Sequence, residues 1–137
     1  MKRNMFGAVT ALVLALLVNV GLAQSKTKAD VPFAFHVAQS SMSEGTYSIN
    51  AVADRVMQIR NESTNAAVMV MTQREESLKP QSPRLVFHKY GDSYFLAEAW
   101  SGSGDSGMEF PEGKLEQELR AASLNGSGAE EVVIALR

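Results

Sequence analysis

The sequence contains no cysteine, and this absence removes several classes of site at once. A chain without thiols has no disulfide, no cysteine nucleophile, no cysteine-ligated metal and no attachment point for the lipid of a bacterial lipoprotein. If the protein is exported, it must therefore be held together by its core alone.

Basic charge is also scarce, because 13 lysines and arginines stand against 15 aspartates and glutamates. Two of the basic residues, Lys2 and Arg3, belong to the N-terminal segment, so the rest of the chain carries 11 basic and 15 acidic residues. No basic cluster remains that would hold nucleic acid or an anionic membrane surface. We therefore expect no nucleic-acid partner and no stable membrane insertion of the mature chain.

The first 23 residues have the organisation of a secretory signal peptide. A positive start precedes an apolar run at 6–22, and Gly-Leu-Ala at 21–23 supplies the small residues of a cleavage site. We expect residues 1–23 to be removed and the mature protein, starting at Gln24, to be secreted or periplasmic. An uncleaved anchor is the alternative, because the run approaches the length of a spanning helix, although the polar stretch after Gln24 favours cleavage.

Residues 24–137 are enough for a single domain with one modest core. Alternating apolar and polar residues predict strands at 31–37, 46–53, 55–60 and 132–136. The segment 39–45 reads as a polar loop. The run 66–71 is apolar at almost every position, which favours a central strand buried on both faces.

The strongest local signal is a hairpin between residues 84 and 100. Gly91 and Asp92 suit the two central positions of a tight turn, and Gly91 can take the positive φ that such a turn requires. Pairing outward from this turn predicts four opposed pairs: Lys89 with Tyr94, His88 with Phe95, Phe87 with Leu96, and Leu85 with Glu98.

Both faces of this hairpin carry large apolar groups, so we expect it to be covered on both sides. The predicted sets are Leu85, Phe87, Leu96 and Trp100 on one face, and Val86, Tyr90 and Phe95 on the other.

A Gly/Ser-rich stretch at 101–107 predicts a flexible loop, and Pro111 then introduces the only convincing helix, at about 112–124. Asn-Gly at 125–126 supplies a left-handed stop for it. The fold class predicted is mainly β: a small antiparallel barrel or sandwich of about 6–7 strands with one C-terminal α-helix. One face of the helix carries Leu115, Leu119 and Ala122.

Three segments of the mature chain together resemble a known family. They are Asp-Val-Pro-Phe-Ala-Phe-His-Val at 30–37, Gly-Thr-Tyr-Ser-Ile at 45–49, and Leu-Val-Phe-His-Lys-Tyr-Gly-Asp-Ser-Tyr-Phe-Leu at 85–96. These motifs resemble a family of small exported bacterial proteins of acidobacterial type. The resemblance implies a bacterial, extracytoplasmic, mostly β domain, and it implies no activity and no site residues.

One string imitates a catalytic motif. Gly-Asp-Ser-Gly at 104–107 matches the nucleophile motif of chymotrypsin-like proteases, in which the serine must meet a histidine base and a buried aspartate. Met108 stands where a further glycine is expected, neither histidine lies in its expected motif, and the chain is too short for the two-barrel fold. We therefore expect Ser106 to belong to a loop rather than to a catalytic triad.

Metal binding is the sharper alternative. Met69 and Met71 place two thioethers on one face of a strand, and cuprous copper favours such soft ligands. Small periplasmic copper carriers combine methionines with a histidine and a tryptophan. This chain also has these residue types, in His36, His88 and Trp100. Methionines in an apolar strand are nevertheless usually core filler. Zinc is less favoured, because the two histidines lie 52 residues apart with no third ligand placed near them.

Both histidines fall among aromatic residues on predicted strands. The interpretation we favour is a structural histidine whose polar edge reaches solvent or a backbone partner, and the alternative is a base paired with Glu44 or Glu98. Glu98 opposite Leu85 marks either an exposed face or a carboxyl with a shifted pKa.

No residue constellation in the chain fixes a chemistry, and no catalytic residue, metal site or cofactor is predicted. The function favoured is a non-catalytic extracytoplasmic interaction or envelope-associated module that binds a protein partner or a second copy. The main alternative is a lipocalin-like barrel that holds a small apolar ligand. A hydrolase and a copper carrier are less favoured than either. The interior of such a barrel would be formed by Phe33, Phe35, Tyr47, Phe87 and Trp100.

Overall fold

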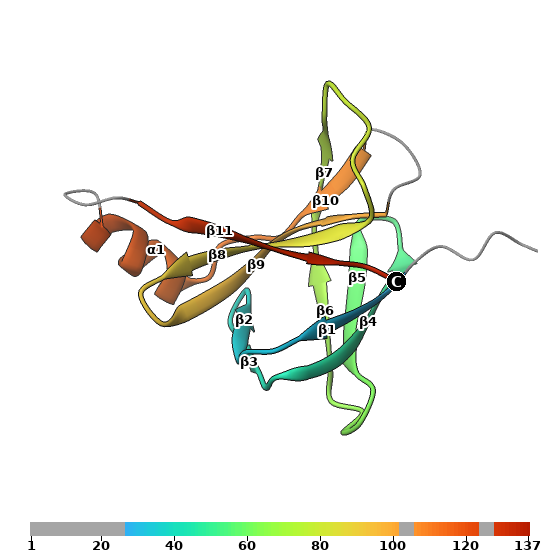
Figure 1. The fold of residues 1–137 in the computed structure, drawn as a ribbon, viewed down its shortest axis with the longest axis horizontal. Helices are drawn as coiled ribbons and strands as arrows, with labels where there is room; N and C mark the ends of the chain where they lie inside the picture. Colours follow the sequence, from blue (N-terminus) through green and yellow to red (C-terminus); the bar gives the residue numbers. More distant parts are fainter. Residues whose placement is uncertain (1–26, 102–105, 124–127) are drawn as a thin grey trace, which may run out of the picture.

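The computed structural model describes residues 27–101, 106–123 and 128–137 (Figure 1). The predicted signal peptide at 1–23, the start at Gln24 and the helix stop at 125–126 lie outside these ranges. Within them the protein is mainly β, with two sheets and one helix in the C-terminal region. Among the described residues, no helix has the length and apolar character needed to span a bilayer.

The first sheet has four antiparallel strands in the order β1-β4-β5-β6. Two of them confirm the strands expected at 46–53 and 55–60, since alternating apolar residues there face the core. The strands are β1 (Lys28–Val31), β4 (Gly45–Ala53), β5 (Val56–Asn61) and β6 (Ala67–Met71).

The second sheet follows the order β11-β8-β9-β10-β7, and β2 and β3 extend it. β2 lies parallel to β9 through the pair His36 and Phe95, which makes this sheet mixed. Its strands are β2 (Phe35–Val37), β3 (Ser40–Met42), β7 (Gln73–Glu76), β8 (Arg84–Tyr90), β9 (Ser93–Trp100), β10 (Ser106–Glu109) and β11 (Glu130–Ala135).

The two sheets meet at two corners. At one corner the chain passes directly from β6 to β7 through Thr72, whose backbone N–H and hydroxyl donate to the Arg55 carbonyl at 2.7 and 3.0 Å. At the other, Lys28 and Arg137 exchange two backbone hydrogen bonds, of 3.1 and 2.8 Å. The strands form two sheets without closing into a barrel, so the barrel alternative is wrong.

The structure describes eleven strands where the sequence predicts six or seven. One expected strand is divided into two, and polar segments that were not expected to form strands also pair in the sheets. The strand expected at 31–37 becomes the end of β1 and the whole of β2, which belong to different sheets. Pro32 lies at the break, where its missing N–H prevents a continuous ladder. The expected loop at 39–45 contains β3. β7 and β10, rich in polar residues, carried no alternation that predicts strands.

The run at 66–71 is an edge strand, β6, and the expectation of a central strand is wrong. Val70 is buried against the core, whereas the side chains of Met69 and Met71 are 62% and 74% exposed. The outward face of β6 is apolar without being covered, and composition alone does not distinguish these two situations.

The hairpin turn is confirmed. Gly91 has φ +59°, and Tyr90 pairs with Ser93 on either side of it. The pairs predicted next to the turn are confirmed as well: Lys89 with Tyr94, His88 with Phe95, and Phe87 with Leu96.

Beyond these pairs a β-bulge shifts the register, and the predicted pair of Leu85 with Glu98 is wrong. Ala97 is the extra residue, so Val86 faces Glu98, and Arg84 faces Trp100. The bulge moves Trp100 to the face opposite the one predicted, because directly opposed residues share a face. Coverage on both faces is confirmed by the burial of Leu85, Phe87, Val86 and Phe95.

The helix α1 (Lys114–Ala122) forms near its expected position, but the expectation of an apolar buried face is wrong. Leu115 is 44% exposed and Ala122 is exposed, whereas Glu116 is 3% exposed. The reason is the surface beneath Glu116, since His88 and Tyr90 of β8 offer polar partners to a carboxylate rather than an apolar groove.

The core lies between the two sheets, and aromatic rings occupy its centre. Phe87 is fully buried and packs edge to face against Phe33 and Phe35, with ring centroids 5.1 and 5.3 Å away. Phe35 packs in turn against Tyr47, with centroids 5.0 Å apart. Aliphatic residues complete this core: Val31, Val37, Ile49, Ile59, Leu85 and Leu96.

Candidate functional site

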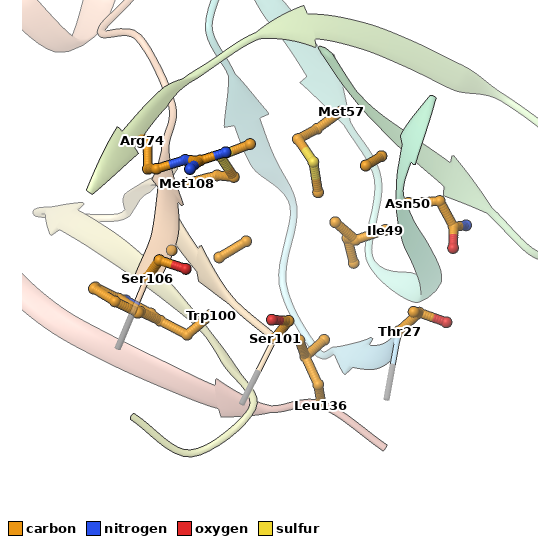
Figure 2. Close-up of a pocket in the computed structure, with 13 residues that line it drawn as sticks. Thr27, Ile49, Asn50, Met57, Arg74, Trp100, Ser101, Ser106, Met108 and Leu136 are labelled. Atoms are coloured by element: carbon orange, nitrogen blue, oxygen red, sulfur yellow. The ribbon is translucent and has the colours of Figure 1, made fainter. Parts of the chain in front are cut away.

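An open cleft of about 430 Å³ lies between the two sheets. Figure 2 shows that side chains surround it from several strands, with Ile49 and Met57 contributed by the first sheet and Trp100 by the second. Thr27 and Leu136, close to the two described ends of the chain, also line it. We call this feature the inter-sheet cleft.

The walls of the inter-sheet cleft are largely apolar. Ile49 and Met57 point inward from neighbouring strands of the first sheet, and Ala99 and Met108 form an opposed pair on the second. Leu136 adds a buried aliphatic side chain where the chain leaves β11. Ala99 contributes only a methyl group, which leaves room between the sheets for another molecule.

The rim of the cleft is polar. Hydroxyl and amide groups come from Thr27, Asn50, Ser101 and Ser106, and one charged group comes from Arg74. Arg74 lies opposite Met108 in the pairing of β7 with β10, and Figure 2 shows the two side chains next to each other. Among the described residues, no carboxylate forms an ion pair with Arg74.

Trp100 borders the cleft, with its ring fixed on the opposite face of β9 from Ala99. Its indole N–H donates to Glu98 Oε2 at 2.8 Å, and the side chain is almost completely buried. The ring rests against Gly107, where an added Cβ would lie 2.6 Å from two ring carbons. Gly107 is therefore required by the position of the Trp100 ring.

Three carboxylates gather on the other face of the second sheet. Burial raises the pKa of the Glu75 carboxyl, and the negative charges of Glu98 and Glu109 raise it further. Glu75 Oε2 is buried without a hydrogen-bond partner. Among the described residues, no group of three or more histidine, aspartate or glutamate side chains has the geometry to hold a metal ion.

A second polar group fixes the helix to the sheet. Glu116 Oε2 lies 3.2 Å from His88 Nδ1 and accepts a hydrogen bond from the Tyr90 hydroxyl at 3.4 Å. The hydrogen bond to Glu116 raises the pKa of His88, against a smaller opposing effect of burial. His88 is thus paired with Glu116 and not with Glu44 or Glu98, the two carboxylates considered from the sequence.

This pair makes the stability of the domain depend on pH. Because the folded-state pKa of His88 lies above its ordinary value of 6.5, the stabilisation is complete below pH about 6.5 and is lost as pH rises through the folded-state pKa. We expect the urea midpoint to fall over that interval, and the fall to be much smaller in Glu116→Gln.

The other groups that face His88 are Glu131 across from it on β11, Glu98 and Tyr90, and Glu116→Gln leaves all three unchanged. His88→Gln is the matched control and should abolish the fall. Equal pH dependence in the wild type and in Glu116→Gln would contradict the assignment.

The structure does not assemble the catalytic set considered for Ser106. Ser106 is the first residue of β10, so the expectation that it belongs to a loop is wrong. It is exposed on the rim of the inter-sheet cleft, and no histidine is among the residues that line the cleft. The preceding Gly104 and Asp105 lie outside the described residues. His36 stacks on Phe95 with ring centroids 4.9 Å apart, and its Nδ1 lies 3.3 Å from the Ser41 hydroxyl.

The residues considered for copper are likewise spread over the molecule. Met69 and Met71 lie together on the outward face of β6. His88 lies against α1, and Trp100 borders the cleft. His36 stacks on Phe95 in the second sheet. Only the two thioethers are brought to one surface.

Sequence reasoning did not single out Arg74, Glu75 or Glu116. Arg74 and Glu75 stand in a polar segment that predicts no strand, and Glu116 has the ordinary spacing of an exposed helical residue. Their surroundings depend on partners far along the chain, so no local pattern marks them. No protein-family model, curated protein or solved structure matches this chain.

Proposed function

We propose that this protein is a non-catalytic extracytoplasmic binding domain that holds a small apolar molecule in the inter-sheet cleft. The observation that carries the proposal is the cleft itself. Its volume of about 430 Å³ lies in the range of small-molecule sites, and such sites combine apolar walls with a few polar groups. The proposed location follows from the expected signal peptide at 1–23.

The distribution of aromatic residues supports a cleft that lies at the margin of the core, beside its aromatic centre. Phe33, Phe35, Tyr47 and Phe87 pack against one another and fill the centre of the domain. Of the five aromatic residues expected to surround a ligand, only Trp100 lines the cleft. The site therefore differs from the interior of a lipocalin-like barrel: it is an opening between two sheets.

The apolar walls would supply the affinity. An apolar molecule that enters the cleft removes its own surface from water and contacts Ile49, Met57 and Leu136, whose side chains are already largely buried. The Trp100 ring lies on the opposite face of the second sheet, with Gly107 and Glu98, so it borders the cleft and reports on it rather than contacting the ligand tail. Binding needs no catalytic group, in keeping with the absence of a histidine from the cleft lining.

Tryptophan fluorescence tests this proposal directly, because Trp100 is the only tryptophan in the sequence and lines the cleft. We expect decanol to give a saturable change in the emission. Ala51→Phe, at an exposed position that lines the cleft, should fill the opening and weaken decanol binding about tenfold or more.

Ala53→Phe is the matched control, since Ala53 is exposed on the same strand but lies away from the cleft. It should bind decanol as the wild type does. An emission that does not change with decanol, or equal weakening by the two phenylalanine variants, would contradict the proposed site.

Self-association is a second candidate function, and the exposed edge of β6 favours it. This edge reads Ala-Val-Met-Val-Met, without the charged residues or proline that usually protect a free strand edge. Two copies could pair their β6 edges and cover Met69 and Met71. Native mass spectrometry separates the candidates, because a retained small molecule supports the first and a dimer supports the second.

A further inference from the structure

The charge of the inter-sheet cleft indicates more than an apolar ligand. Arg74 is the only ionisable side chain among the described residues that line it, and the chain as a whole has an excess of acidic groups. Arg74 forms no ion pair with any described carboxylate. The cleft thus combines an apolar interior with one positive charge at its rim.

The alternation of β7 places Arg74 on the cleft face and Glu75 on the other. Arg74 lies opposite Met108, whereas the next residue, Glu75, lies opposite Gly107. Since successive side chains of a strand point to opposite faces, Arg74 shares the face of Met108 and the cleft, and Glu75 joins Glu98 on the other face. Glu75 is therefore turned away from the guanidinium, whereas Glu76, opposite Ser106, shares the face of Arg74 without forming an ion pair with it.

A guanidinium at an apolar opening fits one class of ligand head particularly well. Its planar fork of N–H donors matches the two oxygens of a carboxylate. A single positive charge also balances a monoanion, whereas a doubly charged phosphate would call for a second basic residue, and the described lining holds none. The Thr27 and Ser106 hydroxyls at the rim offer further donors.

We propose that the cleft selects amphiphiles that carry a single carboxylate, with the tail against Ile49, Met57 and Leu136 and the carboxylate at Arg74. This inference rests on the proposed function, because it assigns a ligand class to the same cleft. Because the cleft is open at its polar rim, the tail of such a ligand can enter between the sheets while the head stays at the rim.

Decanoate and decanol, which share the same tail, separate the contribution of the head from that of the cleft. We expect Arg74→Met to weaken decanoate binding about fivefold, as measured by Trp100 fluorescence, and to leave decanol binding unchanged. Methionine keeps an apolar side chain at the rim and removes the charge. Added salt should weaken the binding of decanoate to the wild type and not that of decanol.

Arg60→Met is the matched control, because Arg60 is an exposed arginine of β5 that does not line the cleft. It should leave the affinities for both probes unchanged. If decanol binds but Arg74→Met leaves decanoate binding intact, or weakens both probes equally, the carboxylate assignment is overturned and the proposed function stands. If neither probe binds the wild type, both are overturned.

Discussion

Phe87→Ala is expected to lower the free energy of unfolding by about 3–5 kcal/mol, the largest loss of any single substitution considered. Phe87 is fully buried, and its ring joins the packing of two other aromatic residues, Phe33 and Phe35. Removing the ring loses the transfer energy of a large apolar group and leaves a cavity that two sheets tied at their corners cannot close. Urea denaturation followed by circular dichroism measures the loss.

Phe87→Leu is the informative companion variant. Leucine retains much of the buried volume but not the edge-to-face ring contacts, so its loss should be clearly smaller than that of alanine. If Phe87→Ala does not fold, Phe87→Leu still tests the prediction. A loss below about 1 kcal/mol for the alanine variant would show that Phe87 is not the centre of the core.

Gly107→Ala is expected to cost about 1–3 kcal/mol although it adds a single methyl group. The new Cβ would lie 2.6 Å from two carbons of the Trp100 ring and 3.0 Å from the Ala99 carbonyl oxygen. The indole must therefore move, and its hydrogen bond to Glu98 must lengthen or break. We expect a lower unfolding midpoint together with a shift of the tryptophan emission.

The added methyl group and the ring can be separated by a double variant. Trp100→Phe introduces a smaller ring, so Gly107→Ala should cost less in that background than in the wild type. Ser106→Ala, at the exposed neighbouring position, should change stability by no more than about 0.5 kcal/mol. An unchanged emission and midpoint for Gly107→Ala would place the Trp100 ring elsewhere.

The elements that were predictable from the sequence are those fixed by local chemistry. The turn at Gly91 depends on a positive φ that glycine adopts without strain, and the pairs beside it follow from the turn alone. The final strand at the sheet edge, β11, was also expected at nearly its observed bounds.

Features set by distant partners were not predictable. The bulge at Ala97 leaves no trace in the alternation of β9, yet it moves Trp100 to the other face. Helix α1 has apolar residues at helical spacing, but its neighbour on β8 offers His88 and Tyr90, so Glu116 is the residue that is buried.

The residues of the candidate site were likewise predictable only in part. Trp100 was among the residues considered for a ligand site, because aromatic side chains are common in such sites. Arg74 was not, since its role depends on the pairing of β7 with β10 and on an opening between two sheets. A single sequence contains no local signal for a space that distant strands surround.

The corner formed by Lys28 and Arg137 imposes an order on folding. Figure 1 shows that the described C-terminal end lies beside the start of β1. Asp30 and the guanidinium of Arg137, 107 positions apart in the sequence, form a two-pronged ion pair beside the backbone bonds that join the sheets. Such long-range contacts require a large loop to close first, which slows folding. During synthesis from the N-terminus, β1 therefore lacks its partner across this corner until Arg137 has been made. The corner can form only after the rest of the domain has been made.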